Sequence, residues 1–111
     1  MEKILSLLGF VKKAGKLVTG NNAVLRSILY GEAELIIVTE NAGDSVKKKF
    51  KRLCEENDVE FFVLGNEADF ERATGEQNKV IYSVIDAGFK NKLVQLINDW
   101  KNNGGAVIGK N

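Results

Sequence analysis

The sequence contains no histidine, no proline and only one cysteine among its 111 residues. Without histidine, the chain cannot build a Ser-His triad, a histidine general base or the usual histidine-containing zinc sites. The single thiol, Cys54, excludes an internal disulfide and indicates a reducing compartment. We therefore expect a cytoplasmic protein whose chemistry does not depend on histidine.

Long hydrophobic segments are also lacking. Apolar runs such as residues 35–38 are far shorter than the roughly 18 residues that a membrane helix needs. The first residues lack the apolar region and small-residue cleavage site of a signal peptide, so we expect no membrane segment. Hydrophobic residues make up 44% of the chain, and we find neither an internal repeat nor a linker rich in Pro and Ser. We predict one globular domain over residues 1–103 and a flexible, Gly-rich tail over residues 104–111.

Few motifs in the chain indicate chemistry. Gly104-x4-Gly109-Lys110 has the outline of a phosphate-binding loop, but Asn111 stands where that loop has Ser or Thr, and no helix follows. Cys54 lies on the expected inner face of a helix, where a thiol usually serves as a small apolar group. No spacing singles out a catalytic or metal-binding pair among the carboxylates considered, which are Glu40, Asp44, Asp86 and Asp99. We expect no enzyme activity, metal or cofactor.

The formal net charge of +1 hides an uneven distribution. Residues 3–31 hold five basic groups and no acid, residues 47–52 read Lys-Lys-Lys-Phe-Lys-Arg, and acids gather between residues 55 and 76. One face of the protein could therefore attract phosphates although the whole molecule is nearly neutral. The alternative is that both basic segments are solvated helix flanks, and we favour that interpretation for residues 47–52.

Hydrophobic periodicity predicts an alternation of helices and strands. Apolar residues recur at helical spacing over about residues 3–13, 22–30, 44–54, 67–73 and 89–100. Strands are predicted at residues 17–19, 35–38, 61–64 and 80–85. This order is typical of an α/β protein, a three-layer α/β/α sandwich around a small mixed sheet of about four strands.

The ends and the inner faces of these helices can also be predicted. We expect an Asn of the Gly20-Asn21-Asn22 turn to cap the second helix, because its side chain can accept from free N–H groups. The second helix should bury Val24, Leu25, Ile28 and Leu29. We further expect Asp44 or Ser45 to cap the third helix, and Asp86 the last one.

The Gly20-Asn21-Asn22 turn could also bind RNA. Glycine permits close approach of another backbone, amides can read base edges, and a helix start directs free N–H groups at phosphates. Lys16 precedes the turn, and Arg26 follows it by one helical turn. The alternative is an ordinary helix cap.

The segment TGNNAVLR at residues 19–26, followed by GEAELIIVTENA at residues 31–42, resembles the signature of the L7Ae/L30e ribosomal-protein family. That signature is Gly-x-Asn-Glu-x-x-x-Lys, a helix ending in Gly, then Ala-x-Leu with three apolar residues and Ala/Thr-Glu-Asp. The segment VIDAGF at residues 84–89 is similar to the family's last strand and turn, and GFKNKL at residues 88–93 to its bacterial YlxQ-like branch. The likeness covers about residues 3–100.

This resemblance implies the same sandwich fold and a protein that binds structured RNA. Well-known members of the family bind kink-turns, which are sharply bent internal loops, so ribosomal RNA or the ribosome is an expected partner. The resemblance implies contacts from the start of the second helix and two loops, at residues 39–41 and 76–79. The RNA-binding residues that we expect are Lys16, Gly20, Asn21, Asn22, Ala23, Arg26, Thr39, Glu40, Asn41, Gln77, Asn78 and Lys79.

The chain departs from the family pattern at Ala23, where kink-turn binders usually have a Glu that reads a guanine edge. Loss of that acceptor would cost about 1–3 kcal/mol of base discrimination. The sequence therefore indicates RNA binding more strongly than strict kink-turn specificity. Two alternatives stay open, a protein-interaction adaptor that has kept the fold and lost the RNA, and a small enzyme acting on RNA or nucleotides.

Overall fold

The predicted alternation of helices and strands is confirmed by a computed structural model, which describes residues 1–105. Within that range the elements are α1 (Glu2–Lys13), β1 (Leu17–Thr19), α2 (Asn21–Leu29), β2 (Leu35–Val38), α3 (Asp44–Glu56), β3 (Glu60–Val63), α4 (Glu67–Thr74), β4 (Ile81–Val84) and α5 (Ala87–Asn102). Most of the predicted tail, residues 106–111, lies outside the described residues. α5 is the longest helix at 16 residues, and no helix within residues 1–105 could cross a bilayer.

The four strands form one mixed sheet in the order β1-β4-β2-β3. β4 pairs antiparallel with β1 and with β2, whereas β2 and β3 are parallel. The two central strands are buried along their whole length, because helices cover both faces of the sheet. Tyr82 of β4 is paired with Thr19 of β1 on one side and with Ile37 of β2 on the other. The end of β1 therefore lies level with the end of β2 across the sheet.

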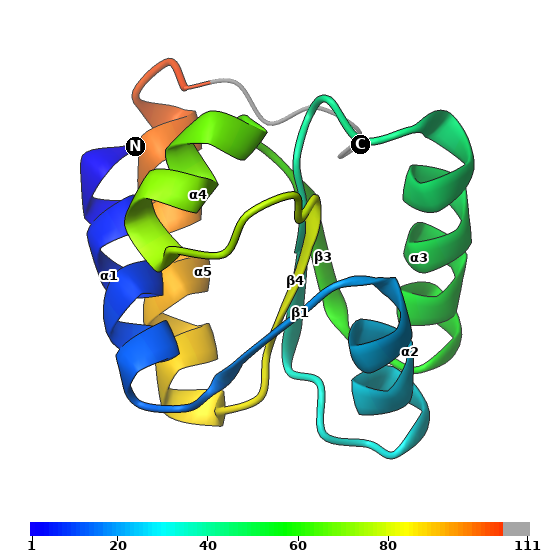
Figure 1. The fold of residues 1–111 in the computed structure, drawn as a ribbon. Coiled ribbons are helices and arrows are strands. Elements are labelled where there is room, and N and C mark those ends of the chain that lie inside the picture. The colour runs from blue at the N-terminus through cyan, green and yellow to red at the C-terminus, as the bar shows by residue number, and fades with distance from the viewer. Residues whose placement is uncertain (106–111) are drawn as a thin grey trace.

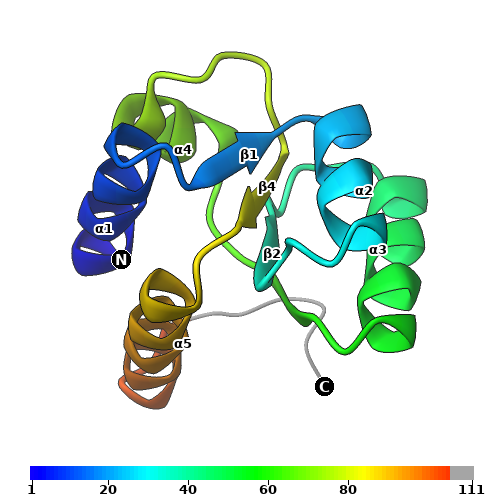
Figure 2. The same cartoon turned by 90° about the horizontal axis from the view of Figure 1, so that it is seen from below.

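The helices are divided between the two faces of the sheet. α1, α4 and α5 lie on one face, and α2 and α3 lie side by side on the other (Figures 1 and 2). Leu35 and Ile37 of β2 belong to the apolar cluster under the first group, and Ile36 and Val38 to the cluster under the second. This alternation follows from the two-residue period of a strand. It confirms the predicted sandwich.

The predicted inner face of α1 is confirmed, whereas that of α2 needs one correction. All four predicted α1 residues are buried, namely Ile4, Leu5, Leu8 and Val11. In α2, Val24 and Ile28 are buried as predicted and Leu25 is half-buried, but Leu29 is 58% exposed and Ser27 is buried in its place. The Ser27 hydroxyl donates to the Val24 carbonyl at 2.7 Å and lies 2.9 Å from the hydroxyl of Ser83 in β4. Because this hydroxyl is satisfied, a polar residue can occupy the buried position.

The predicted helix caps are confirmed at one helix and wrong at two. The Asp86 carboxylate accepts from the Phe89 N–H at 2.9 Å at the start of α5. α2 instead begins after Gly20, whose φ of +90° is unfavourable for any residue with a Cβ, and no Asn side chain caps it. α3 begins after Gly43, so Asp44 is already its first residue and caps nothing. In both helices a glycine stands at the cap, and the first N–H groups have no side-chain acceptor.

Candidate functional site

Three segments of the predicted site meet at one end of the sheet. The Gly20 N–H donates to the Ile81 carbonyl at 3.1 Å, and the Thr39 N–H donates to the Val80 carbonyl at 2.9 Å. Residues 80 and 81 are consecutive, so the start of α2 and the loop after β2 flank the same stretch of chain. The loop at residues 76–79 leads directly into that stretch. The fold therefore brings together segments that are up to about 60 residues apart in the sequence.

Lys79 lies over the start of α2. A Cβ placed on Gly20 would lie 3.3 Å from the Lys79 ammonium, so glycine leaves room for this side chain. The first turn of α2 contains no acid, and no side chain caps it. The free N–H groups and the positive end of the helix dipole thus add to the lysine charge. Together they form a small electropositive site that suits an anion such as a phosphate.

The loop at residues 76–79 is held in place at both ends. The Glu76 carboxylate accepts from the Lys12 ammonium of α1 and, at 3.1 Å, from the Thr19 hydroxyl of β1. The Tyr82 hydroxyl donates to the Lys79 carbonyl at 3.0 Å. The two residues between these anchors are exposed, and the second has a positive φ of 59°. The loop therefore presents Gln77 and Asn78 outward from a fixed base.

The loop after β2 is bonded mainly within the protein. The Asn41 amide donates to the Glu67 carboxylate, and its carbonyl accepts from the Glu67 N–H, both at 3.1 Å. The Glu40 N–H donates to the Gly65 carbonyl at 2.9 Å, and the Glu40 carbonyl accepts from the Lys47 ammonium at 2.6 Å. These contacts tie the loop to the starts of α3 and α4. Asn41 thus has a positioning role besides the predicted RNA contact.

Thr39 differs from the other site residues because its side chain is fully buried. Its hydroxyl is the one buried side-chain polar atom within residues 1–105 without a hydrogen-bond partner. In this conformation the Thr39 hydroxyl does not reach the surface, although Thr39 lies inside the cluster through its backbone.

The exposed side of α2 presents Asn22 and Arg26. These residues are four positions apart and therefore lie on one helix face, and both are exposed. Asn21 is exposed, whereas Ala23 is half-buried at the start of the helix. Within residues 1–105 we find no ion pair of Arg26, so its guanidinium is available to a ligand.

Lys16 lies apart from this cluster. Its carbonyl accepts from the Ile85 N–H at 3.0 Å, which places Lys16 at the far end of the β1–β4 ladder from Gly20. Four strand residues correspond to about 13 Å. Closeness in sequence to Gly20 therefore did not translate into closeness in space.

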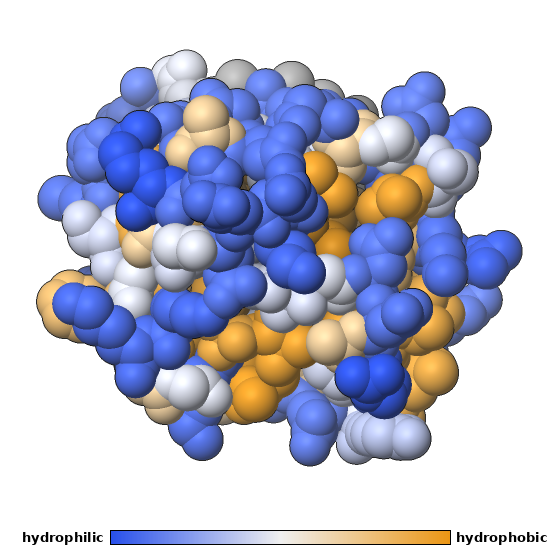
Figure 3. All heavy atoms as spheres, in the orientation of Figure 1, coloured by the Kyte–Doolittle hydropathy of each residue, from blue (hydrophilic) through white to orange (hydrophobic). Residues whose placement is uncertain are grey.

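Apolar surface lies beside the polar loops. Figure 3 shows hydrophobic surface between the hydrophilic side chains over α4 and those over α3. Val46 of α3 and Val80 before β4 are half-buried members of the apolar cluster on the α2 and α3 side. An electropositive rim beside an apolar area suits a nucleic acid, whose phosphates are charged and whose unpaired bases are flat and apolar on their faces.

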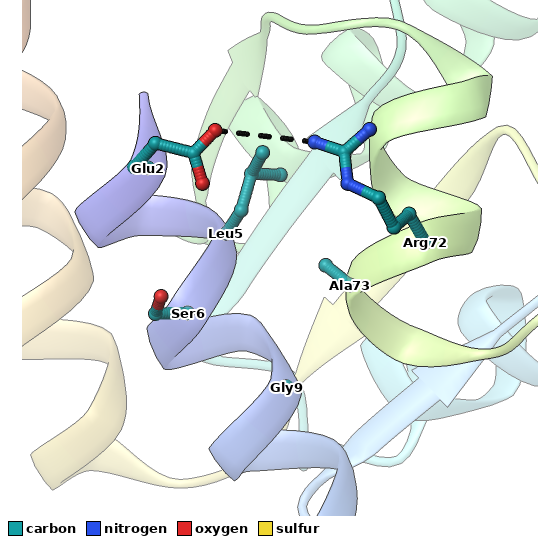
Figure 4. Close-up of a pocket in the computed structure, with 6 residues that line it drawn as sticks. All are labelled: Glu2, Leu5, Ser6, Gly9, Arg72 and Ala73. Carbon is teal, nitrogen blue, oxygen red and sulfur yellow. Dashed lines mark ion pairs between the residues drawn. The ribbon is translucent and has the colours of Figure 1, made fainter.

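Within the described residues the other chemical candidates lack the geometry of an active site. Burial, and secondarily the charge of Glu55, raises the pKa of the Cys54 thiol to about 12, so it is a poor nucleophile. No group of three His, Cys, Asp or Glu side chains in this part of the chain could hold a metal ion. A crevice of about 250 Å³ between α1 and α4 (Figure 4) contains one ion pair, between Glu2 and Arg72 at 3.9 Å.

Residues that hold the site together were harder to find in the sequence. Lys12 and Glu76 are 64 residues apart, and neither belongs to a motif that would pair them. Glu76 was expected only as part of a loop, whereas the structure makes it the anchor of that loop.

Comparisons with known proteins agree with the described fold. The family model of the ribosomal protein L7Ae/L30e/S12e/Gadd45 family matches residues 2–94. The RNA-binding protein YlxQ of Bacillus subtilis is 33% identical over 82% of this chain and 91% of its own length. A solved structure of a protein with unknown function from Bacillus halodurans C is 38% identical, has a TM-score of 0.84, and is matched over 86% of this chain and 97% of that one. The Giardia lamblia 15.5kD RNA binding protein has a TM-score of 0.74 at 20% identity, over 87% and 86% of the two chains, and is similar in fold.

Proposed function

Since the chain belongs to the ribosomal protein L7Ae/L30e/S12e/Gadd45 family, we propose that it is a non-catalytic protein that binds structured RNA. The observation that carries this proposal is the electropositive start of α2, where Lys79 lies over Gly20 and no acid is present in the first turn. The name of the Bacillus subtilis relative supports the same function. We place this activity in the cytoplasm, in agreement with the single free thiol.

The proposed mechanism divides the work between phosphates and bases. Lys79, Arg26 and the free N–H groups of α2 contact phosphates, which fixes the position of the RNA. The Asn22 amide hydrogen-bonds to an unpaired base. The base must be unpaired, because the major groove of an RNA duplex is too deep and narrow for side chains to read.

The RNA that fits this site is a bent stem with an internal loop. A kink-turn or a loop of ribosomal RNA presents unpaired bases between two stems, and the start of α2 and the two loops of the site meet at one end of the sheet. Ala23 lacks the carboxylate that reads a guanine, so we expect recognition of bent internal loops that is looser than strict kink-turn specificity.

The test is a salt-dependent binding titration with a consensus kink-turn RNA and a straight duplex of equal length. Asn22→Ala combined with Arg26→Ala should weaken binding to the kink-turn RNA at least tenfold. One phosphate contact strengthens binding by about five- to eightfold when the salt concentration falls from 1 M to 0.1 M, and a variant without that contact loses this gain. The loss of the amide contact weakens binding further. Both residues are exposed, so the fold should be unchanged.

A matched control removes an exposed asparagine and an exposed cation elsewhere. Asn91→Ala with Lys92→Ala makes the same change of charge on α5, on the opposite face of the sheet. This double variant should bind as the wild type does. Unchanged affinity of the Asn22 and Arg26 variant would overturn the site assignment, and equal binding of both RNAs with a steep salt slope would leave only a basic surface.

A protein-interaction adaptor is the second candidate, and one observation favours it. Leu29 and Tyr30, at the end of α2, are 58% and 74% exposed. Large apolar side chains next to one another on a surface often belong to a protein interface. The adaptor hypothesis predicts that Leu29→Ser with Tyr30→Ser removes an RNA-independent partner, whereas RNA binding stays unchanged.

A further inference from the structure

The charges of α3 are divided between its two halves. In the second half each cation faces an acid four residues later, Lys51 with Glu55 at 3.6 Å and Arg52 with Glu56 at 4.0 Å. Each pair lies one helical turn apart, which is the spacing at which side chains on a helix surface meet. The second half of α3 is thus internally neutral.

The first half of α3 carries an excess of positive charge. Residues 47–49 are three consecutive lysines, and Asp44 is the single acid in the first two turns. The Lys47 ammonium donates to the Glu40 carbonyl at 2.6 Å, and the Lys49 ammonium lies 5.5 Å from the centre of the Phe50 ring. Lys48 and Lys49 are exposed, and we find no ion pair of either within residues 1–105.

This order of charges opposes the helix dipole. Cations are stabilising near the C-terminus of a helix and acids near its N-terminus, each by a modest amount at the surface. In α3 the acid Asp44 in the first turn follows this rule, whereas the last turn holds Glu55 and Glu56 and has no basic residue, and the lysines lie in the half of the helix nearer its start. Stability of the helix does not explain this arrangement, whereas an anionic ligand near the start of the helix would.

The start of α3 adjoins the proposed RNA site. The Lys47 ammonium donates to the carbonyl of Glu40, which lies in the loop after β2. The first residue of that loop, Thr39, is bonded to Val80, and Gly20 is bonded to the next residue, Ile81. α2 and α3 lie side by side on the same face of the sheet and run in the same direction, and α3 begins farther up in the view than α2 (Figure 1). A stem that extends from the start of α2 past the loop after β2 would therefore reach the first turns of α3.

We propose that Lys48 and Lys49 form a second contact surface, which binds the phosphate backbone of an RNA stem leaving the internal loop. The proposal rests on the proposed function, because the loop bound at α2 places the stem. Lysine is a compact point charge on a flexible side chain, which suits backbone phosphates better than base edges. This surface therefore adds affinity and orients the stem, and it reads no sequence.

The experiment compares two double variants that remove the same charge from the same helix. Lys48→Gln with Lys49→Gln removes the unpaired cations, and Lys51→Gln with Arg52→Gln removes the compensated ones. With a kink-turn RNA carrying full stems, the first variant should lower the slope of log K against log salt by about 1.4–1.8. If the variant and the wild type bind equally at 1 M salt, this change of slope makes the variant bind at least about 25-fold more weakly than the wild type at 0.1 M salt.

One phosphate contact contributes about 0.7–0.9 to this slope, and the Lys51 and Arg52 variant should change the slope by less than that amount. Equal effects of the two variants would overturn the proposal, since α3 would then act only through the total charge. Thermal unfolding should show an unchanged midpoint for the Lys48 and Lys49 variant, because both side chains are exposed.

A second RNA separates this proposal from the proposed function. When the stem is shortened to the pairs that close the internal loop, the effect of the Lys48 and Lys49 variant should vanish, whereas that of Asn22 and Arg26 should persist. A persistent effect of the lysines on the short RNA would overturn the stem contact alone. Loss of the Asn22 and Arg26 effect on both RNAs would overturn the loop site, and with it the placement of the stem.

Discussion

The two faces of the sheet use their charged residues differently. On the face covered by α1, α4 and α5, two ion pairs join separate elements, Arg72 of α4 to Glu2 of α1 and Lys12 of α1 to Glu76, and Arg72 also pairs with Asp69 within α4. On the face covered by α2 and α3, the ion pairs that we find within residues 1–105 join residues of α3 to one another. On the first face, ion pairs thus connect separate elements. On the second face, Arg26 of α2 and Lys48 and Lys49 of α3 are exposed and form no ion pair that we find within residues 1–105.

This difference explains how a protein of net charge +1 can present a phosphate-binding surface. Most acids lie on or near α4 and on the last turn of α3, and Glu76, which is bonded to Thr19 beside Gly20, is paired with Lys12. Local potential depends on nearby charges, because salt screens those farther than about 8–10 Å. Distribution therefore matters more than the total.

The largest effect that we predict tests the structural role of the α1, α4 and α5 face. Phe70 is fully buried and packs against Tyr82 with ring centres 5.1 Å apart. Phe70→Ala should lower the free energy of unfolding by about 3–5 kcal/mol, because it leaves a large cavity. Phe10→Ala, the same substitution at a 62% exposed position, should change it by less than about 0.5 kcal/mol. Urea unfolding measures both, and equal losses would contradict the described core.

A smaller effect tests the turn where the two faces meet. Gly20→Ala introduces a Cβ at a φ of +90° and at 3.3 Å from the Lys79 ammonium. We expect a loss of about 1–3 kcal/mol of stability from the backbone strain. RNA affinity should also fall, because Lys79 is displaced. Gly15→Ala is the control, since Gly15 also has a positive φ but no atom within 4 Å of its Cβ. It should cost stability and leave RNA affinity intact.

The next prediction concerns specificity at the start of α2. Ala23→Glu introduces the Glu that kink-turn binders usually have at this position. We expect this variant to add about 1–3 kcal/mol to the binding preference for the kink-turn RNA over a straight duplex. Competition binding with the two RNAs measures this preference. Ala23→Gln is the control for size, because it lacks the negative charge. A Glu variant without added preference would indicate that this protein binds a different RNA shape.

The smallest effect tests the apolar interior of the α2 and α3 face through pH. Burial raises the pKa of Cys54 from 9.0 to about 12, so the folded state favours the protonated thiol. The resulting stabilisation is fully present below pH 9 and is lost as the pH rises from 9 to 12. Between pH 8 and pH 10 the wild type should lose about 1 kcal/mol more stability than Cys54→Ala. Urea unfolding at the two pH values checks it, and identical losses would contradict the burial of the thiol.

Local patterns were enough to predict much of the fold. The helical spacing of Ile4, Leu5, Leu8 and Val11 and the apolar run of β2 placed both elements correctly, because their burial follows from the chain's own periodicity. The caps were less predictable. An Asn of the Gly20-Asn21-Asn22 turn was the expected cap, but Gly20 takes that place because its positive φ lets the chain enter α2 from β1.

The candidate site divides in the same way. The segment from Gly20 to Arg26 could be identified in the sequence, because its residue types and spacing resemble a family signature. The burial of Thr39, the position of Lys16 at the other end of β1 and the internal bonds of Asn41 could not be predicted. Each depends on how one element packs against another.

The sequence by itself therefore determined the order of the elements, the fold class and the helix at whose start the candidate site lies. Only the tertiary structure decided which side chains reach the surface there and which cations lack an acid nearby. The physical reason is range. Periodicity and turns act between residues a few positions apart, whereas the anchor between Lys12 and Glu76 spans 64 residues and exists only once the fold has brought these two segments together.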